Sequence, residues 1–391
     1  MNNRYDVIVV GAGPAGSHAA CMLADSGARV ALLEKSSFPR EKTCGGLLSE
    51  KSLRLLGEWR DELPSSQAIH CLKLYSRDME FVEFNSPVRL GKTILRERFD
   101  QFLVDKCISK GVNFHDSTPI VDIIQDNSNV TVISKGTRFT APFLIAADGA
   151  LSRTSSLLGI RPIGFNFKMG FACSLIMQTA PGFIDDSTVE LFFIPFIGGF
   201  GWCFPLPGDF INIGVGASCF ALKHLYPYFQ TFISRVFEDK GVLPPKNQIR
   251  PRGAFIPAGG FRRAIGINRV LLAGDAAGGV DAFSGEGIYH ALLSGEQAAS
   301  AVYEGLCKPS LKPVELYTSL YDQAFSRERR RSLALAILSL HKGQGFFRLF
   351  KENPKLIEWL GNIMLSQYAY SKLRLKDLFH RQRLTGGIWN S

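Results

Sequence analysis

The stretch YDVIVVGAGPAGSHAACMLADSGARVALLE, residues 5–34, decides the fold of the first part of the chain. The apolar run at 5–10 predicts a buried strand, and the small residues at 15–26 predict a helix. Residues 29–33 form a second apolar run and predict a second strand. A strand, a glycine-rich turn, a helix and a strand in this order are typical of the first β-α-β unit of a doubly wound fold.

The turn GAGPAG has the glycine spacing of a dinucleotide-binding loop. Gly11 permits the tight turn, Gly13 lets the backbone approach a pyrophosphate, and Gly16 permits close packing of the helix. The helix N-terminus offers free N–H groups and a positive dipole end to the phosphates. Glu34 follows about 20 residues on, where a carboxylate binds ribose hydroxyls. Together these features predict a dinucleotide site.

Two later segments also have sequence patterns that indicate a nucleotide site. VLLAGDAAGGVDAFSGEGI, residues 270–288, is a buried strand followed by a glycine-rich loop and the start of a long helix. Asp275 follows that strand and suits a ribityl or ribose hydroxyl, and the helix N-terminus can face a flavin ring and its phosphates. FLIAADGALS, residues 143–152, ends a third strand at Asp148, in a turn that we expect to pack beside the nucleotide. These signals favour a flavin dinucleotide.

Between these segments the pattern changes to short strands rich in Phe, Ile and Gly, and after them it becomes helical. We also expect helices at 46–60 and 284–305. The pattern therefore predicts a discontinuous nucleotide-binding domain, an inserted β-rich domain and a basic helical C-terminal region. The expected boundaries are 1–70, 97–160 and 265–330 for the first, 71–96 and 161–264 for the second, and 331–391 for the third.

The amino-acid composition of the chain argues against several classes of protein. The chain has 391 residues, 46% hydrophobic and 20% charged, which fits a folded protein and excludes wholesale disorder. Its eight cysteines include no C-x-x-C pair, which argues against a zinc site or a disulfide framework and for reduced thiols in the cytosol. No signal peptide precedes the first strand, and no apolar stretch reaches the roughly 18 residues that cross a bilayer. We expect a cytoplasmic protein.

The net charge of +10 is concentrated near the C-terminus. From Arg327 onward, 13 Lys and Arg stand against four acidic residues. The same region carries Phe346, Phe347, Phe350 and Trp359, a composition that suits peripheral docking on an anionic membrane. A solvated helical bundle explains the same charge, and both interpretations stay open. No recognised DNA or RNA module accompanies the charge, so we expect no nucleic-acid partner. Nothing in the sequence indicates an oligomeric state.

Several motifs occur in the order found in one superfamily of flavoproteins. The set GAGPAG…E, R-x-x-F-D-x-x-L, A-D-G and G-D-A-A-G…G-E-G-I resembles the FAD-dependent hydroxylases and reductases. FPREKTCGGLLSEKSLRLL at 38–56, FGWCFP at 200–205 and GEGIYHAL at 285–292 resemble the geranylgeranyl reductase family more specifically. The resemblance implies an α/β fold of the p-hydroxybenzoate hydroxylase type. In that fold a Rossmann-like FAD-binding domain carries an inserted antiparallel β-sheet substrate domain and a helical C-terminal region.

The resemblance also implies roles for individual residues. Cys44 would be the catalytic residue, beside the flavin ring, and no metal is implied. The implied FAD-binding residues are Gly11, Gly13, Ala15, Gly16, Glu34, Arg40, Cys44, Gly45, Arg96, Ile120, Asp148, Gly274, Asp275, Gly285, Gly287 and Ile288. The strand near Ile120 would border the adenine. The residues implied to line the substrate cavity are Phe200, Trp202 and Phe204.

The implied activity is reduction of carbon–carbon double bonds in a geranylgeranyl-type polyprenyl group, on a lipid, pigment precursor, quinone or diphosphate. Reduced FAD would deliver a hydride to one carbon while a proton reaches the other, and NADPH or a ferredoxin-type carrier would supply the electrons. A long apolar cavity is needed, since burying a prenyl chain gains roughly 0.8 kcal/mol for each CH₂. The Phe-rich strands of the inserted domain are candidates for its wall.

Two alternatives stay open. The first is an FAD-dependent monooxygenase of an apolar or aromatic substrate, because no feature of the sequence excludes oxygen. The second is a non-catalytic protein that binds FAD and a lipid. The family's cavity motif begins P-x-x-Y, whereas this chain has Ile197 and Phe200 at those positions, so the cavity lacks one hydroxyl. Halogenases of the superfamily carry W-x-W-x-I-P, and Phe200 and Phe204 count against that activity.

Overall fold

A mainly parallel sheet forms one half of the molecule, and its four central strands are completely buried. The computed structural model describes residues 3–160, 169–196, 198–245, 250–258, 264–342, 344–366 and 369–372. The six-stranded sheet has the order β18-β19-β12-β1-β2-β8, in which only the β18–β19 pair is antiparallel. Its strands are β1 (Val7–Val10), β2 (Val30–Leu33), β8 (Asn113–His115), β12 (Phe143–Ala146), β18 (Gly266–Ile267) and β19 (Val270–Leu272). Burial on both faces explains why the central strands are continuous apolar runs.

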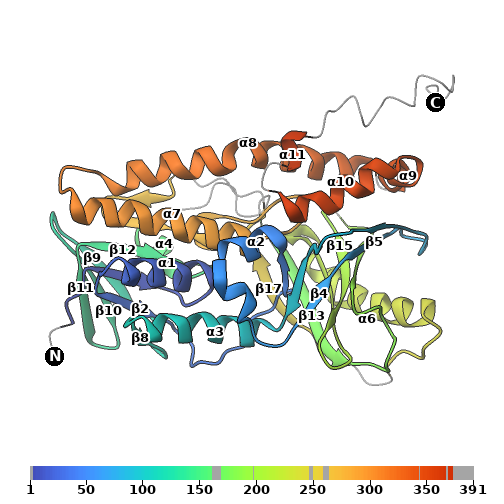
Figure 1. Ribbon diagram of the computed structural model, residues 1–391, viewed down its shortest axis with the longest axis horizontal. Coiled ribbons are helices and arrows are strands. Elements are labelled where there is room, and N and C mark those ends of the chain that lie inside the picture. Colours follow the sequence, from blue (N-terminus) through green and yellow to red (C-terminus); the bar gives the residue numbers. More distant parts are fainter. Residues whose placement is uncertain are drawn as a thin grey trace.

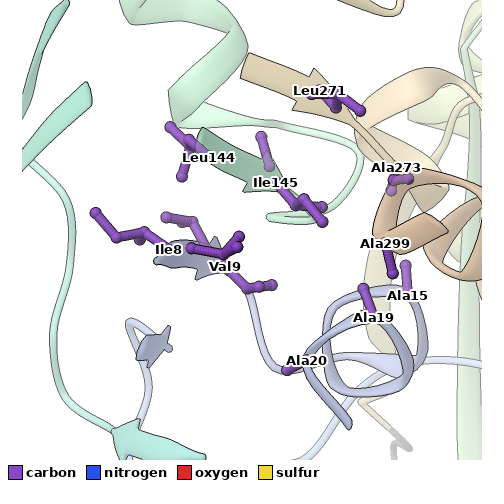
Figure 2. Packing of buried hydrophobic residues seen from close by; sticks show 14 of the residues in the cluster. Ile8, Val9, Ala15, Ala19, Ala20, Leu144, Ile145, Leu271, Ala273 and Ala299 are labelled. Carbon is purple, nitrogen blue, oxygen red and sulfur yellow. The ribbon is translucent and has the colours of Figure 1, made fainter. Parts of the chain in front are cut away.

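Small residues let the helices approach this sheet and one another closely. The helices are α1 (Pro14–Asp25), α3 (Arg96–Ser109), the short α4 (Arg153–Leu157) and α7 (Ile288–Cys307). Figure 2 shows Ala15 and Ala19 of α1 directed towards Ala299 of α7. A Cβ atom on Gly295 of α7 would lie 3.1 Å from the Ala15 carbonyl carbon, so only glycine fits there. Close contact with α7 fixes the position of α1 and of the glycine-rich turn before it.

A mixed seven-stranded sheet forms the other half (Figure 1). Its order is β17-β13-β16-β15-β14-β5-β6, and every pair is antiparallel except β5–β14. These two strands are far apart in the sequence, so no hairpin turn requires them to run in opposite directions. The strands are β5 (Cys71–Tyr75), β6 (Phe81–Asn85), β13 (Gly170–Gln178), β14 (Thr188–Phe193), β15 (Phe200–Leu206), β16 (Phe210–Ser218) and β17 (Arg252–Ile256).

Each face of this sheet packs against a different set of helices. On β15, Cys203 packs in a core with α6 (Leu222–Asp239), whereas Trp202 and Phe204 pack in a core with the C-terminal helices. The alternation follows from the two-residue period of a strand. The C-terminal helices, which lie across the top of Figure 1, are α8 (Pro313–Lys342), α9 (Gln344–Glu352), α10 (Pro354–Leu365) and α11 (Ala369–Lys372). No helix among the described residues is long and apolar enough to span a membrane.

Two small sheets complete the described chain. One contains β9 (Asp122–Gln125), β10 (Val130–Ser134) and β11 (Thr137–Ala141), and it adjoins the parallel sheet. The other has the order β3-β7-β4, with β3 (Leu47–Ser49), β4 (Ser66–Ile69) and β7 (Gly91–Ile94). A helix α2 (Glu50–Leu55) and a 3₁₀ turn (Gly57–Asp61) follow β3. This second sheet holds the loop that carries Cys44 and Gly45.

Three local expectations need correction. Residues 46–60 are not one helix, because Leu47–Ser49 pair with β7 and only Glu50–Leu55 are α-helical. The helix expected from 284 begins at Ile288, after a loop in which Gly285 has a positive φ of 71°. The strand expected near Ile120 is β9, which begins at Asp122, so Ile120 itself lies in the segment before it. Some expectations concern residues that the structure does not describe. These residues are 161–168 of the expected inserted domain, 373–391 of the expected C-terminal region, and Ile197 of the cavity motif.

Candidate active site

One cavity of about 960 Å³ joins the two halves of the molecule. It extends from the carboxyl ends of the parallel strands, across the Cys44 loop, to the face of the seven-stranded sheet that the C-terminal helices cover. Of the nineteen residues that the sequence singles out, every one except Gly16 lines this cavity. A Cβ on Gly16 would lie 3.1 Å from the Gly11 carbonyl carbon, so Gly16 serves the packing of the turn. The volume is at the upper end for small-molecule sites.

The glycine-rich turn forms the nucleotide end of the cavity. Gly11 adopts a φ of +101°, and a Cβ there would lie 2.6 Å from the Ala147 carbonyl carbon. Gly13 caps α1 and has no side chain to bond the first N–H groups of the helix. Those donors remain for an anionic group, which the helix dipole also favours. The backbone here fits a pyrophosphate.

Glu34 closes this end of the cavity. Its buried carboxylate accepts hydrogen bonds from the backbone N–H groups of Ala12 and Ser36, each at 3.0 Å. The Arg40 guanidinium lies 3.5 Å away. On the other side, Asp148 accepts a hydrogen bond from the Thr154 N–H through one oxygen. The other oxygen of Asp148 is buried without a protein partner, so it can accept a bond from a ligand hydroxyl.

A buried charge cluster follows at the centre of the cavity. Asp100, which is fully buried, accepts two hydrogen bonds from Arg96, at 2.9 and 3.0 Å, and pairs with Arg40 at 3.1 Å. Burial alone would lower the pKa of the Arg96 guanidinium, but Asp100 and a hydrogen bond to the Cys44 side chain hold that pKa above its ordinary value. Arg96 is therefore a permanent cation beside Cys44.

The Cys44–Gly45 loop packs directly on the seven-stranded sheet. A Cβ on Gly45 would lie 2.8 Å from the Phe204 ring and 3.4 Å from Nε1 of Trp202. The Asn212 side chain donates a hydrogen bond to the Cys44 carbonyl at 2.7 Å and accepts one from the Trp202 indole at 2.9 Å. Sequence patterns did not single out Asn212, although a polar residue in the apolar run FINIGVG is a signal.

The loop before α7 forms the opposite wall. Glu286 pairs with Lys51 at 2.6 Å and accepts a hydrogen bond from Ser49, which ties this loop to β3 and α2. Burial raises the pKa of Asp275, and Lys42 and Arg96 oppose the rise. The Lys51–Glu286 pair was also missed, because 235 positions separate its members and neither belongs to a recognised pair motif.

The far half of the cavity is apolar. Side chains from the sheet and from the C-terminal helices face each other across it, and ring contacts of Phe283 with Trp359 and Tyr370 connect the α7 loop to those helices. The residues on this wall include Leu72, Leu74, Val189, Leu191, Phe193, Phe200, Trp202, Phe204, Phe350, Leu360, Ile363 and Met364. Such a wall can bury a long hydrocarbon chain.

Known proteins place these features in a family. Residues 4–195 match the FAD binding domain family. Digeranylgeranylglycerophospholipid reductase 1 of Methanosphaera stadtmanae is 30% identical over 318 residues, 77% of this chain and 76% of that protein. Menaquinone reductase of Mycolicibacterium smegmatis is 28% identical over 359 residues, 86% of each chain. The solved structure of a geranylgeranyl bacteriochlorophyll reductase-like protein from Thermoplasma acidophilum shares the fold, with a TM-score of 0.80, 21% identity and coverage of 97% and 99%. The chain is thus an FAD-dependent oxidoreductase, and it belongs to the geranylgeranyl reductase family.

Proposed function

We propose that this protein saturates carbon–carbon double bonds of a geranylgeranyl-type polyprenyl group carried on a lipid, quinone or diphosphate. One observation carries the proposal: residues suited to FAD and a wall of apolar and aromatic side chains line the same cavity. The names of the relatives support a prenylated substrate, since one is a digeranylgeranylglycerophospholipid reductase and another a menaquinone reductase. For the electron donor we propose NADPH or a ferredoxin-type carrier.

Residues at different points along the cavity would bind different parts of the cofactor. Gly11, Gly13 and the N-terminus of α1 would hold the pyrophosphate, and Glu34 would hold a ribose. When bound and reduced, FAD supplies a hydride for addition to an alkene. Arg96, fixed by Asp100, would hold positive charge beside the flavin. The same assignments extend to the other proposed cofactor residues, which are Ala15, Arg40, Ile120, Asp148, Gly274, Asp275, Gly285, Gly287 and Ile288.

The substrate half would position the prenyl chain and exclude water. Phe200 and Trp202 lie 5.7 Å apart between ring centroids, with their planes tilted by 32°, and form an aromatic surface in the cavity. A double bond held against that surface would lie between the aromatic rings and the flavin. Cys44 is the thiol of the Cys44–Gly45 loop and would stand at the reacting carbon, where we propose that it serves as the catalytic residue.

Anaerobic flavin reoxidation tests the proposal. Photoreduced protein is mixed without oxygen with geranylgeranyl diphosphate, a geranylgeranyl glycerolipid or a menaquinone, and flavin absorbance is followed. We expect reoxidation by at least one of them, and Cys44→Ser should slow it at least tenfold. Cys219→Ser is the matched control, since Cys219 is also half-buried but lies outside the cavity lining. A flavin that stays reduced with every prenyl compound contradicts the proposal.

For the basic C-terminal region we propose peripheral contact with an anionic membrane surface, where prenylated lipids reside. The described part of this region already packs its aromatic residues inward, because Phe346, Phe347 and Phe350 are buried against the seven-stranded sheet. Contact would therefore come from the basic side chains. Co-sedimentation with phosphatidylglycerol vesicles, with and without residues 373–391, tests this; no binding by either protein rejects it.

A further inference from the structure

Asn212 connects the two halves of the site at a point that no motif marks. It lies on β16 with 3% of its surface exposed, between Phe204 of β15 and Ile176 of β13, and its side chain reaches the Cys44 loop. Its Nδ2 donates to the Cys44 carbonyl oxygen at 2.7 Å. Its Oδ1 accepts from Trp202 Nε1 at 2.9 Å, and Trp202 is 4% exposed. One amide thus bridges the loop and the cavity wall.

The partners determine which way the amide points. A backbone carbonyl only accepts and an indole N–H only donates, so the NH₂ group must face Cys44 and the oxygen must face Trp202. If the amide were flipped by 180°, its oxygen would face the Cys44 carbonyl and its NH₂ group would face the indole N–H, and neither hydrogen bond could form. Replacing Asn212 with an apolar residue leaves the buried Trp202 N–H and the part-buried Cys44 carbonyl without this partner, and loss of the buried bond in particular destabilises the site.

Because the side chains around Trp202 are closely packed, the hydrogen-bond bridge through Asn212 affects the orientation of the Trp202 ring. The Trp202 ring lies across Gly214, its partner on β16, and a Cβ there would be 2.6 Å from two atoms of the ring. The Phe204 ring lies against Gly45 in the same close way. Trp202 can therefore tilt only towards the cavity, and the hydrogen bond to Asn212 opposes that tilt.

We propose that Asn212 is a positioning residue, which fixes the tilt of the Trp202 indole relative to the Cys44–Gly45 loop. The consequence for turnover rests on the proposed function: Asn212 would govern the rate at which a bound double bond is reduced, and hardly affect substrate affinity. The consequence for the loop does not rest on it, because release of the Cys44 carbonyl loosens the loop whatever the substrate.

The experiment compares Asn212→Leu and Asn212→Asp with Thr93→Val. Leucine matches asparagine in size and loses both bonds; aspartate keeps an acceptor for Trp202 but cannot donate to Cys44. Thr93 is a matched control, since its buried hydroxyl donates to the Pro205 carbonyl of β15 and not to the Cys44 carbonyl. If the Asn212→Leu variant does not fold, the Asn212→Asp variant alone tests the proposal.

Two readouts are taken on the flavin-loaded protein. The first is the iodoacetamide alkylation rate of Cys44, resolved by peptide mass spectrometry, which should rise at least threefold in the Asn212 variants. The second is single-turnover reoxidation, whose limiting rate should fall at least tenfold while the half-saturating substrate concentration changes less than threefold. Thr93→Val should change neither.

The outcomes separate the two proposals. If alkylation rises but the wild-type protein is reoxidised by no prenyl compound, the positioning role stands and the proposed function fails. If the wild type turns over and the Asn212 variants match Thr93→Val in both readouts, the positioning role is overturned. A rise in half-saturating concentration with an unchanged limiting rate overturns it as well, because it would make Asn212 a binding residue.

Discussion

Gly214 and Gly216 offer a paired test of how the cavity wall is built. Both lie on β16, two residues apart and on the same face, so the change to alanine alters the backbone propensity of the strand equally. A Cβ on Gly214 would lie 2.6 Å from Trp202 Cε2 and Cη2 and nearer still to Cζ2. A Cβ on Gly216 would lie 3.3 Å from the Phe200 ring. The first substitution forces a large movement of the Trp202 ring, whereas the second requires the Phe200 ring to shift by only a few tenths of an ångström.

The expected magnitude follows from these distances. Carbon atoms attract each other best at about 3.5–4.0 Å, so Gly214→Ala must displace the Trp202 ring by more than about 1 Å. Overpacking of this kind costs roughly 1–3 kcal/mol. Breaking the bond to Asn212 leaves buried polar groups unpaired and adds roughly 1–3 kcal/mol. We expect Gly214→Ala to destabilise the protein by about 2–6 kcal/mol and Gly216→Ala by less than about 1 kcal/mol.

Thermal unfolding of the two variants, together with the flavin content of the purified proteins, measures the difference. Gly214→Ala should unfold at a clearly lower temperature than Gly216→Ala. In a Trp202→Val background, where the ring is absent, Gly214→Ala should lower the melting temperature much less than it does in the wild type. Equal melting temperatures for Gly214→Ala and Gly216→Ala, or the same effect of Gly214→Ala with and without the Trp202 ring, would refute the packing described for this wall.

Changes elsewhere in the site also have expected outcomes. Glu34→Gln should weaken FAD binding about tenfold in an apoprotein titration, since a charged acceptor becomes neutral; unchanged affinity would restrict Glu34 to supporting the turn. Lys51→Met leaves Glu286 buried without its cation and should destabilise the protein by about 3 kcal/mol in urea unfolding, whereas Lys51→Met with Glu286→Gln should lose much less; equal losses would contradict this. Burial pushes the pKa of Asp281 up, but its charged and hydrogen-bonding neighbours, Tyr370 among them, hold that pKa below its ordinary value. The stability that Asp281 contributes is therefore present above its ordinary pKa of 3.8 and is lost as the pH falls through the lower, folded value. Tyr370→Phe should destabilise the protein at pH 7 and less below pH 3.8; a loss that is the same at both pH values would contradict the linkage.

The nucleotide end of the site was predictable from the sequence because its chemistry demands particular residues at particular spacings. A pyrophosphate on a helix N-terminus needs glycine at Gly11 and Gly13, whatever the rest of the chain does. The aromatic wall was predictable in part, since Trp202 and Phe204 alternate with Cys203 along one strand. Alternation alone does not tell which face meets the substrate; that depends on where the C-terminal helices pack.

The contacts between distant segments were not predictable in the same way. The partners of Asn212 come from a strand ten residues away and a loop 168 residues away, and no local pattern encodes the second. Residues 46–60 were assigned to one helix because their composition favours it, but pairing of Leu47–Ser49 with β7 outweighs that propensity. Tertiary hydrogen bonding decided both cases.

Mass analysis of the product tests the central claim most directly. Photoreduced protein is given geranylgeranyl diphosphate, the geranylgeranyl glycerolipid and menaquinone in separate anaerobic reactions, and parallel samples are opened to air. The account predicts a product that gains two hydrogens for each double bond reduced, formed without oxygen and at the expense of reduced flavin. A product that appears only in air and gains an oxygen atom would contradict it and make the protein a monooxygenase.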